Sequence, residues 1–336
     1  MKLTSGKSGD SRVFVITSRE TTAVRTTLAV LSTVRSEESL KTSRVNNILV
    51  IKVLRTLAEE LAEALRAKGV GSLLIGRLEP ELQRVAVKML TKGYGVVYNG
   101  DNGRTVAEEL GVRLMRPGGE ERADARVEKG GEIPFTPPET PQFVLDFSLW
   151  DELDEEERKK TLFQVEMTVA TIRKWLWEGN IRLANLPPGV TFPYSFAVKE
   201  AEGKCVVLDP KGDDVDTEGL RQFDVFVIGA VVDKGRRLKN ATLRIVEKAG
   251  YDCPRVRIAL WGSTLGVPDE INKIVEIVLR VKRGEELEKA ILDTMSKSDI
   301  LARAKWEMDR GEREKAQVLI DLAKSRGLKV HFLETK

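Results

Sequence analysis

Two strand-and-loop segments near the middle of the chain decide its fold. Residues 224–240 read DVFVIGAVVDKGRRLKN, and residues 255–278 read RVRIALWGSTLGVPDEINKIVEIV. Each segment begins with an apolar strand that runs into a glycine-bearing loop, and each loop carries one aspartate, Asp233 or Asp269. In an open α/β sheet, ligands bind outside the carboxyl ends of the strands. These two loops therefore predict a binding site with acid–base chemistry.

The surrounding sequence alternates apolar strands with helical runs. Further strands are expected at FVLDFSLW (143–150), SFAVKE (195–200) and CVVLDP (205–210). Helices are expected at 151–177, 238–249 and 268–281, followed by a helical tail at 286–326 and a last strand around His331. Alternation of this kind favours a largely parallel sheet. The acidic residues after Asp151 crowd a helix start, where they suit the helix dipole better than they suit a metal site.

The first third of the chain predicts a separate, smaller α/β domain. Residues 1–45 are rich in Ser and Thr, with one strand at Val13–Ile16, and their composition is compatible with partial disorder. Residues 46–116 alternate helical and strand patterns, including a short helix that ends at Gly111. Residues 117–141 are rich in proline, glycine and charge, and predict a linker.

The bulk composition bounds the class of protein. A chain of 336 residues suits two or three domains of roughly 100–200 residues each. Charged residues make up 32%, above the roughly 25% of ordinary soluble domains, which is typical of thermophile proteins with many ion pairs. No apolar run approaches the roughly 18 residues of a membrane span, and the first residues lack a signal-peptide core. We therefore expect a cytoplasmic protein with no membrane partner.

The few cysteines and histidines limit which catalytic mechanisms and metal sites the protein can have. Cys205 and Cys253 are far apart, too few for a zinc site, and are expected to be unpaired thiols because cytosolic disulfides are rare. The single histidine is His331, so Ser-His-Asp and Cys-His mechanisms are disfavoured. Carboxylates are the expected acid–base groups, and no metal is predicted.

The loop after Asp233 carries a cluster of cations without an interleaved acid: Lys234, Arg236, Arg237 and Lys239. Such a cluster is suited to nucleic-acid phosphates. The basic residues from Arg303 to Lys329 are equally well explained as solvated helix faces. No GxxxxGK[ST] motif is present, and the glycines of VIGAVVDKG and GSTLG do not form a dinucleotide-binding GxGxxG.

Several segments together resemble one known family. The sequence resembles the SPOUT-superfamily tRNA methyltransferases that modify N1 of the purine at tRNA position nine, most strongly over residues 224–281. Five segments carry the resemblance, in the same order as in that family: VLDFSLWDELDEEERKKTLFQ (144–164), IRLANLP (181–187), CVVLDP (205–210), FVIGAVVDK (226–234) and LWGSTLGVPDEINKIVEIVL (260–279). GSTLGVPDEINK most resembles the archaeal branch. The similarity covers roughly residues 140–285, and it departs from the family at Ala230, where a second glycine is common.

The resemblance implies a fold, a cofactor and partners. Residues 142–285 would form a SPOUT-type parallel sheet with a C-terminal trefoil knot, preceded by the N-terminal α/β domain as a tRNA-binding part and followed by a helical extension at 286–336. S-adenosylmethionine would bind to the backbone of three loops, with Asp209 mainly structural: Leu208-Asp209-Pro210, Ile228-Gly229-Ala230 and Leu260-Trp261-Gly262-Ser263. The protein would act on tRNA as a monomer, with Lys234, Arg236, Arg237 and Lys239 on phosphates.

Three aspartates are candidates for catalysis. Guanine N1 carries a proton that a buried carboxylate can accept, whereas adenine N1 already offers a lone pair. Asp233 is the first candidate for the catalytic base; the alternative is that it begins a helix or forms an ion pair. Asp146 either reaches the purine or caps a turn, and Asp269 either acts on the substrate or caps a helix. Trp261 either stacks on the target base or packs against the sheet.

Two other functions are compatible with the sequence. A SPOUT ribose 2′-O-methyltransferase would use an arginine near the first knot strand, and none stands out. A non-catalytic RNA-binding protein would contact phosphates without binding S-adenosylmethionine.

Overall fold

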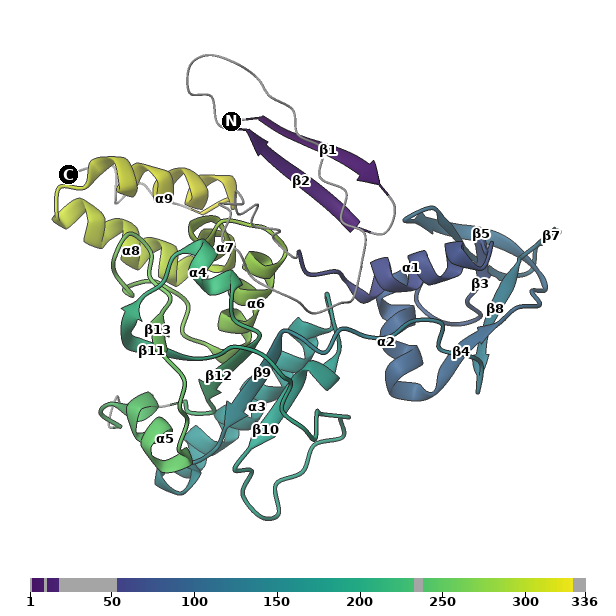
Figure 1. The fold of residues 1–336 in the computed structure, drawn as a ribbon. Coiled ribbons are helices and arrows are strands. Elements are labelled where there is room, and N and C mark those ends of the chain that lie inside the picture. Colours follow the sequence, from purple (N-terminus) through teal and green to yellow (C-terminus); the bar gives the residue numbers. More distant parts are fainter. Residues whose placement is uncertain (1, 9–10, 18–52, 233–237, 329–336) are drawn as a thin grey trace, which may run out of the picture. The chain divides into compact units, whose positions relative to one another are not determined.

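The computed structural model describes residues 2–8, 11–17, 53–232 and 238–328. The chain divides into two compact units, residues 1–53 and 54–336. In the first unit, β1 (Lys2–Ser8) pairs antiparallel with β2 (Ser11–Thr17), which contains the predicted strand Val13–Ile16 (Figure 1). The second unit holds an N-terminal domain, a parallel sheet with its helices, and a helical extension.

The N-terminal domain packs two helices on a mixed sheet. The helices are α1 (Leu57–Ala67) and α2 (Leu82–Lys92). In the described part of the chain the sheet has the order β4 (Tyr94–Val97), β8 (Ala125–Lys129), β3 (Ser72–Leu74), β6 (Val112–Pro117), β5 (Asn102–Glu109) and β7 (Glu121–Arg122). A capping box between Thr56 and Glu59 begins α1. The buried face of this helix carries Leu57, Leu61 and Leu65.

Two predictions in this domain are wrong. The short helix ending at Gly111 is the strand β5, which pairs with β6 through a turn where Leu110 and Gly111 both have positive φ. The predicted linker 117–141 contains β7 and β8, and β8 lies between β3 and β4. Because β8 has one partly exposed, charged face, its sequence ARVEK has the composition of a linker although it completes the sheet.

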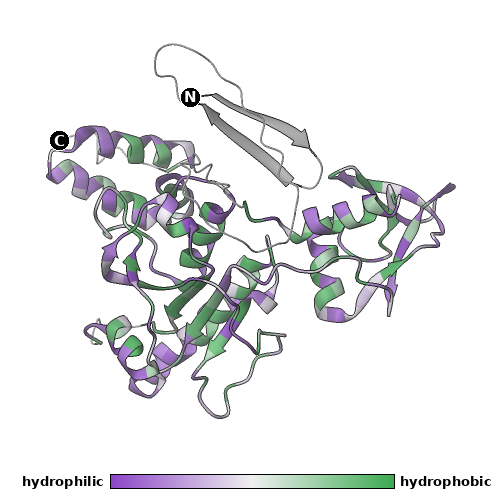
Figure 2. Ribbon diagram, viewed as in Figure 1, coloured by the Kyte–Doolittle hydropathy of each residue, from purple (hydrophilic) through white to green (hydrophobic). Residues whose placement is uncertain are grey.

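The second domain is built on a parallel sheet, as predicted. Its described strands have the order β10 (Ile181–Ala184), β9 (Gln142–Asp146), β12 (Val225–Gly229), β11 (Cys205–Asp214) and β13 (Arg255–Arg257), and every neighbouring pair is parallel. Figure 2 shows the central strands as continuous hydrophobic runs, typical of strands covered on both faces. The strand predicted at 195–200 is absent from the described structure: Ala197 forms a single bridge to Arg182, and Val198 is 93% exposed.

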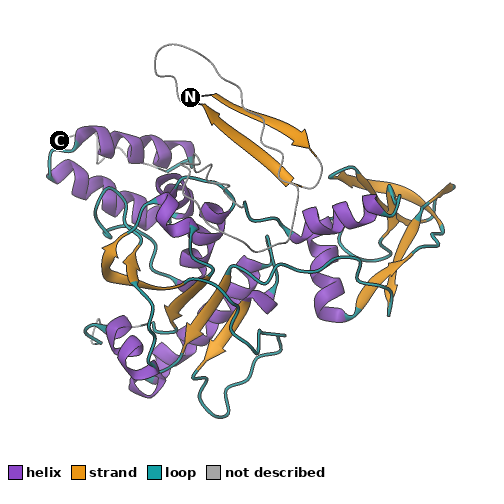
Figure 3. Cartoon of the chain, in the orientation of Figure 1, coloured by secondary structure: helices purple, strands orange, loops and turns teal. Residues whose placement is uncertain are grey.

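Helices follow the strands and continue beyond the sheet (Figure 3). The helices of this domain and its extension are α3 (Glu155–Ile172), α4 (Thr217–Arg221), α5 (Ala241–Ala249), α6 (Ile271–Lys282), α7 (Leu287–Thr294), α8 (Lys297–Asp309) and α9 (Arg313–Ser325), with short 3₁₀ turns at Trp150–Glu152 and Glu178–Asn180. Asp154 and Glu157 form a capping box at the start of α3, so the acidic run begins a helix, as predicted. The predicted last strand, with His331, lies outside the described residues. No helix in the described part of the chain is long and apolar enough to span a membrane.

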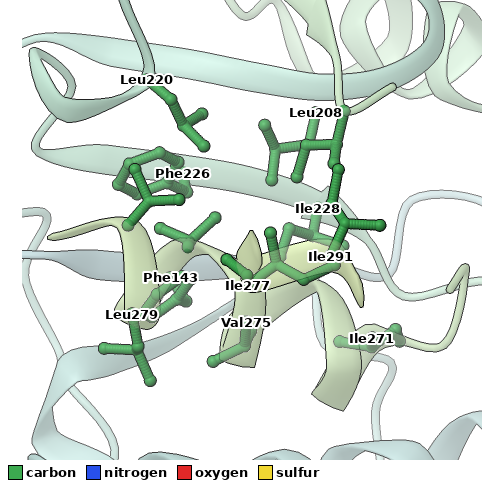
Figure 4. Close-up of a cluster of buried hydrophobic side chains, with 14 of the residues drawn as sticks. Phe143, Leu208, Leu220, Phe226, Ile228, Ile271, Val275, Ile277, Leu279 and Ile291 are labelled. Atoms are coloured by element: carbon green, nitrogen blue, oxygen red, sulfur yellow. The ribbon is translucent and has the colours of Figure 1, made fainter. Parts of the chain in front are cut away.

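The core of this domain lies between the sheet and α6. Phe143 of β9 and Phe226 of β12 stack with ring centroids 5.6 Å apart. Figure 4 shows them together with Leu208 and Ile228 from the sheet and Ile277 from α6. These side chains come from the same strands that carry the predicted loops, so packing of the core fixes where those strands end.

The prediction of two unpaired thiols is wrong. Cys205 and Cys253 form a disulfide, with their Cα atoms 5.6 Å apart. Cys205 begins β11, and Cys253 lies just before β13, the strand that pairs with β11. Parallel pairing of two strands 48 residues apart therefore brings the two thiols together.

Replacing both cysteines with serine should lower the free energy of unfolding by about 4 kcal/mol, because the disulfide closes a loop of 48 residues in the unfolded chain. Urea denaturation followed by circular dichroism measures the difference. Dithiothreitol should destabilise the unsubstituted protein and leave the double variant unchanged. An equal response of both proteins to the reductant would contradict the assignment of the stability to the disulfide.

Candidate functional site

The predicted loops leave the parallel sheet at one edge. Val207 of β11 lies opposite Val227 of β12 on one side and Arg255 of β13 on the other. Gly229 at the end of β12 lies opposite Asp146 at the end of β9. Because all these strands run in the same direction, the segment 228–230 lies at the carboxyl end of β12 and the segment 260–263 lies beyond that of β13, where open α/β sheets bind ligands. The segment 208–210 lies within β11, where the register of its pairing with β13 shifts.

The first loop is an excursion within β11. Leu208 and Asp213 both lie opposite Val256 of β13, so residues 209–212 bulge out of the sheet. The Asp209 carboxylate is 5% exposed and accepts hydrogen bonds from Arg255 Nη1 at 2.9 Å and from the Lys211 N–H at 2.9 Å. Asp209 therefore holds the shape of this loop, in agreement with its expected structural role.

The second loop is held close to its neighbours. A Cβ added at Gly229 would lie 2.6 Å from Ile245 Cδ1 of α5, so any larger residue there would displace the end of this buried side chain. The Ala230 N–H donates to the Asp146 carbonyl at 2.8 Å, and the Ala230 methyl is fully buried. The alanine at this position, which departs from the resembled family, is thus accommodated in the core.

The third loop is a tight hairpin turn. Leu260 and Ser263 exchange backbone hydrogen bonds of 2.9 and 3.1 Å, and the two central residues have positive φ, 50° at Trp261 and 78° at Gly262. Positive φ at both central positions is the requirement of a type I′ turn, which glycine meets without strain and tryptophan does not. The turn adjoins an open hollow of about 560 Å³, lined by Asp214, Val215, Asp216, Gly219, Ala259 and Gly262.

The charged groups around this hollow are already engaged. Arg257 hydrogen-bonds Asp214 and holds the pKa of that carboxyl below its usual range. Asp216 caps α4 by accepting from the Gly219 N–H. Both carboxylates in the lining of the hollow are therefore engaged within the protein. A second hollow, of about 390 Å³, lies between residues of α2 and α3 and includes none of the predicted site residues.

Asp146 is fully buried at the end of β9. Its Oδ1 accepts from the Ser148 N–H at 2.7 Å, and its Oδ2 accepts from Asn185 Nδ2 at 2.8 Å and from the Tyr251 hydroxyl at 2.7 Å. With its carbonyl bound to Ala230, this residue joins four segments of the chain. Of the two roles predicted for Asp146, the structure shows the cap of the turn after β9, through the hydrogen bond from the Ser148 N–H.

The remaining predicted residues separate into two groups. Asp269 is exposed and precedes Glu270, the N-cap of α6, so the alternative that Asp269 caps this helix is wrong. Its carboxylate makes no hydrogen bond or ion pair to the residues that the structure describes. Lys239 is exposed just before α5. Asp233, Lys234, Arg236 and Arg237 lie outside the described residues.

Sequence reasoning missed three residues that build the site. Tyr251 and Asn185 bind the Asp146 carboxylate, and Arg303 of α8 binds the third loop. Asn185 stands in the quoted IRLANLP segment and has a φ of 53°, a conformation that asparagine tolerates better than most residues. Tyr251 and Arg303 carry no local signal, because only the fold brings them to the loops.

Replacing Tyr251 with phenylalanine tests the buried network. Burial, and then its hydrogen bond to Asp146, raises the pKa of Tyr251 above the ordinary value of about 10. The hydroxyl therefore contributes its full stability below pH 10, about 1.5–3 kcal/mol for a bond to a charged acceptor, and loses it as the pH rises above 10 towards the folded-state pKa. Urea titrations at pH 7–11 should show Tyr251→Phe less stable at neutral pH and the difference shrinking above pH 10. A difference independent of pH would contradict the assignment.

The sequence is similar to proteins of known activity. The model of the tRNA (adenine(9)-N1)-methyltransferase N-terminal domain matches residues 55–128, from α1 into β8. The tRNA (adenine(9)-N1)-methyltransferase of Sulfolobus acidocaldarius is 44% identical over 255 residues, which are 74% of this chain and 87% of that protein. The tRNA (guanine(9)-/adenine(9)-N1)-methyltransferase of Thermococcus kodakarensis is 29% identical over 275 residues, which are 71% of this chain and 73% of that protein.

The fold is similar as well. The crystal structure of Sulfolobus acidocaldarius Trm10 in complex with S-adenosylhomocysteine superimposes with a TM-score of 0.68 at 36% identity, over 83% of this chain and 97% of that chain. A 2.1 Å crystal structure of the same protein gives a TM-score of 0.56 at 42% identity, over 71% of this chain and 98% of that chain. On the extent of these similarities, the chain belongs to the tRNA (adenine(9)-N1)-methyltransferase family.

Proposed function

We propose that this protein transfers a methyl group from S-adenosylmethionine to N1 of the purine at tRNA position nine. The observation that carries the proposal is the set of loops at one edge of the parallel sheet, in a chain that is 44% identical to a Sulfolobus enzyme of this activity. The S-adenosylhomocysteine in the related crystal structure is the product that such a reaction leaves behind.

The loops are suited to S-adenosylmethionine. The hollow beside the third loop, about 560 Å³, falls within the roughly 300–1,000 Å³ of ligand sites. Gly229 lies in the second loop, and Gly262 lines the hollow without a side chain that would keep a ligand from its backbone. The neighbouring carboxylates of Asp209 and Asp214 are paired with arginines. We assign cofactor contacts to Leu208, Ile228, Ala230, Leu260, Trp261 and Ser263 together with these glycines, and we propose that the C-terminal part of the sheet is threaded as a trefoil knot.

The cofactor supplies an electrophilic methyl group on a sulfonium. The chain must then hold purine N1 in line with that methyl and deal with the N1 proton of guanine. We propose that Asp233, which follows the second loop in the sequence, accepts the N1 proton of guanine. For adenine, whose N1 lone pair is free, the same carboxylate orients the base.

The other two aspartates take different roles. Asp146 is fully buried and accepts hydrogen bonds at both carboxylate oxygens, so we assign it to positioning the second loop rather than to proton transfer. Asp269 is exposed at the start of α6 and follows the third loop, so we assign it a contact with the target nucleotide.

The tRNA contacts follow from charge and position. Lys234, Arg236, Arg237 and Lys239 lie next to Asp233 in the sequence and are assigned to the phosphates around the target base, which must leave its stack to react. We assign further tRNA contacts to the N-terminal domain, and we propose that the protein acts as a monomer in the cytoplasm.

A methyl-transfer assay on two unmodified tRNA transcripts, with guanine or adenine at position nine, tests the activity. Mass spectrometry of the digested product should find a 1-methylpurine at this position. Asp233→Asn should slow transfer to guanine by about 10²–10⁴-fold, the usual contribution of a general base, and slow transfer to adenine much less. Bound S-adenosylmethionine without product at position nine would overturn the proposed target, and equal losses on both transcripts would overturn the role of Asp233 as a base.

The salt dependence of tRNA binding tests the basic segment. Replacing Lys239 with alanine should weaken binding and reduce the slope of log K against log salt concentration by about one, because one phosphate contact is lost. The matched control is Lys289→Ala, which removes an exposed cation that pairs with Asp293 on α7. Filter binding at several salt concentrations measures both slopes. Equal slopes for Lys239→Ala and the unsubstituted protein would exclude a phosphate contact at this lysine.

A further inference from the structure

A buried arginine of the C-terminal extension binds the third loop. Arg303 lies on α8 and its side chain is 0% exposed. Its Nε donates to Glu307 Oε1 at 2.7 Å, one turn further along the same helix, and Glu307 is buried too. The guanidinium lies 5.5 Å from the ring centroid of Trp261 and 4.8 Å from that of Trp306.

The other guanidinium nitrogens point at the backbone of the loop. Nη2 donates to the Leu260 carbonyl at 2.5 Å, and Nη1 donates to the Leu265 carbonyl at 2.6 Å and the Ser263 carbonyl at 3.3 Å. These carbonyls stand on both sides of the turn at Trp261. The planar fork of one arginine thus fixes the entry and the exit of the turn at once, which a lysine ammonium cannot do.

The contact adds donors to the carbonyls of the turn and lies beside its strained residue. The Leu260 and Ser263 carbonyls each accept the other residue's backbone N–H, and the fork gives each of them a second donor as well as one to the Leu265 carbonyl. Trp261 also has a φ of 50°, which a bulky residue adopts only when the surrounding structure enforces it. A Cβ added at Gly266 would lie 2.8 Å from the Arg303 Cβ and 3.0 Å from the Asp299 carbonyl oxygen, so α8 packs closely against the chain just after the loop.

We propose that Arg303 is a positioning residue for the cofactor, and that the C-terminal helices thereby contribute to the affinity for S-adenosylmethionine. The inference rests on the proposed function, in which residues 260–263 bind the cofactor. Arg303 acts through the backbone of these residues, and Glu307 keeps its guanidinium oriented and its charge compensated.

The size of the effect follows from the population of the ordered loop. The apparent dissociation constant of a ligand equals its intrinsic value divided by the fraction of protein in the binding-competent conformation. If loss of the fork leaves about a tenth of the molecules with the ordered turn, the dissociation constant for S-adenosylmethionine rises about tenfold. Turnover at saturating cofactor should change much less, because cofactor binding restores the same turn.

Isothermal titration of the full-length protein with S-adenosylmethionine tests the proposal on Arg303→Met. A matched control is Arg326→Met: Arg326 of the same extension also donates to backbone carbonyls, those of Leu292, Asp293 and Met295 at the end of α7, and not to the loop. Arg303→Met should bind the cofactor about tenfold more weakly, with a raised KM for S-adenosylmethionine and a similar kcat. Arg326→Met should lower the melting temperature while leaving the dissociation constant unchanged.

A second variant separates a local role from a general loss of stability. Arg303→Lys keeps a positive charge beside Glu307 but lacks the fork, so it should bind S-adenosylmethionine much more weakly than the unsubstituted protein does. If Arg303→Met does not fold, Arg303→Lys is the variant to compare with Arg326→Met. Addition of guanidinium at low millimolar concentration should restore cofactor affinity to Arg303→Ala and not to Arg326→Ala. Unchanged affinity in Arg303→Lys and Arg303→Met, or equal weakening in the Arg326 variants, would overturn the inference. No binding of S-adenosylmethionine by the unsubstituted protein would instead overturn the proposed function.

Discussion

The candidate site depends on the contact between the ends of β9 and β12. There the Asp146 carbonyl receives the Ala230 N–H, while its carboxylate, buried at the same place, binds Ser148, Asn185 and Tyr251. A buried carboxylate is tolerated only when its oxygens are hydrogen-bonded, so the segments that carry the donors must all be in place together. One side chain thereby couples the second loop to the chain around it.

Each of the loops is held by a different charged residue, and none of these residues offers a free group to a ligand. Asp209 pairs with Arg255 at the first loop, Asp146 is bound at the second, and Arg303 binds the third from outside the sheet. Preorganised backbone can recognise a ligand without paying for reordering when it binds. Asp209, Asp146 and Arg303 thus act on the conformation of the loops.

The parallel sheet and its loops were predictable because their signals are local. Apolar runs such as 225–229 ended by glycine predict strands and the loops that follow them. The failures have a common cause in contacts distant in sequence. ARVEK at 125–129 is a strand only because β3 and β4 flank it. SFAVKE at 195–200 has strand propensity but meets its neighbour only in the single bridge between Ala197 and Arg182. Cys205 meets Cys253 only because β11 pairs with β13. Arg303 could not be predicted for the same reason, because the sequence of a helical tail does not indicate which of its arginines is buried.

The disulfide also determines how the protein behaves after a single cleavage of its backbone between Cys205 and Cys253. Residues 205–253 form a covalently closed ring that contains all of β12 and the second loop. A protease that cut the backbone once anywhere inside this ring would leave two fragments still joined through sulfur. The nicked protein would keep its mass on a non-reducing gel and separate into two bands only after reduction. The chain between β11 and β13 is thus secured twice, by the peptide backbone and by a bond that bypasses it.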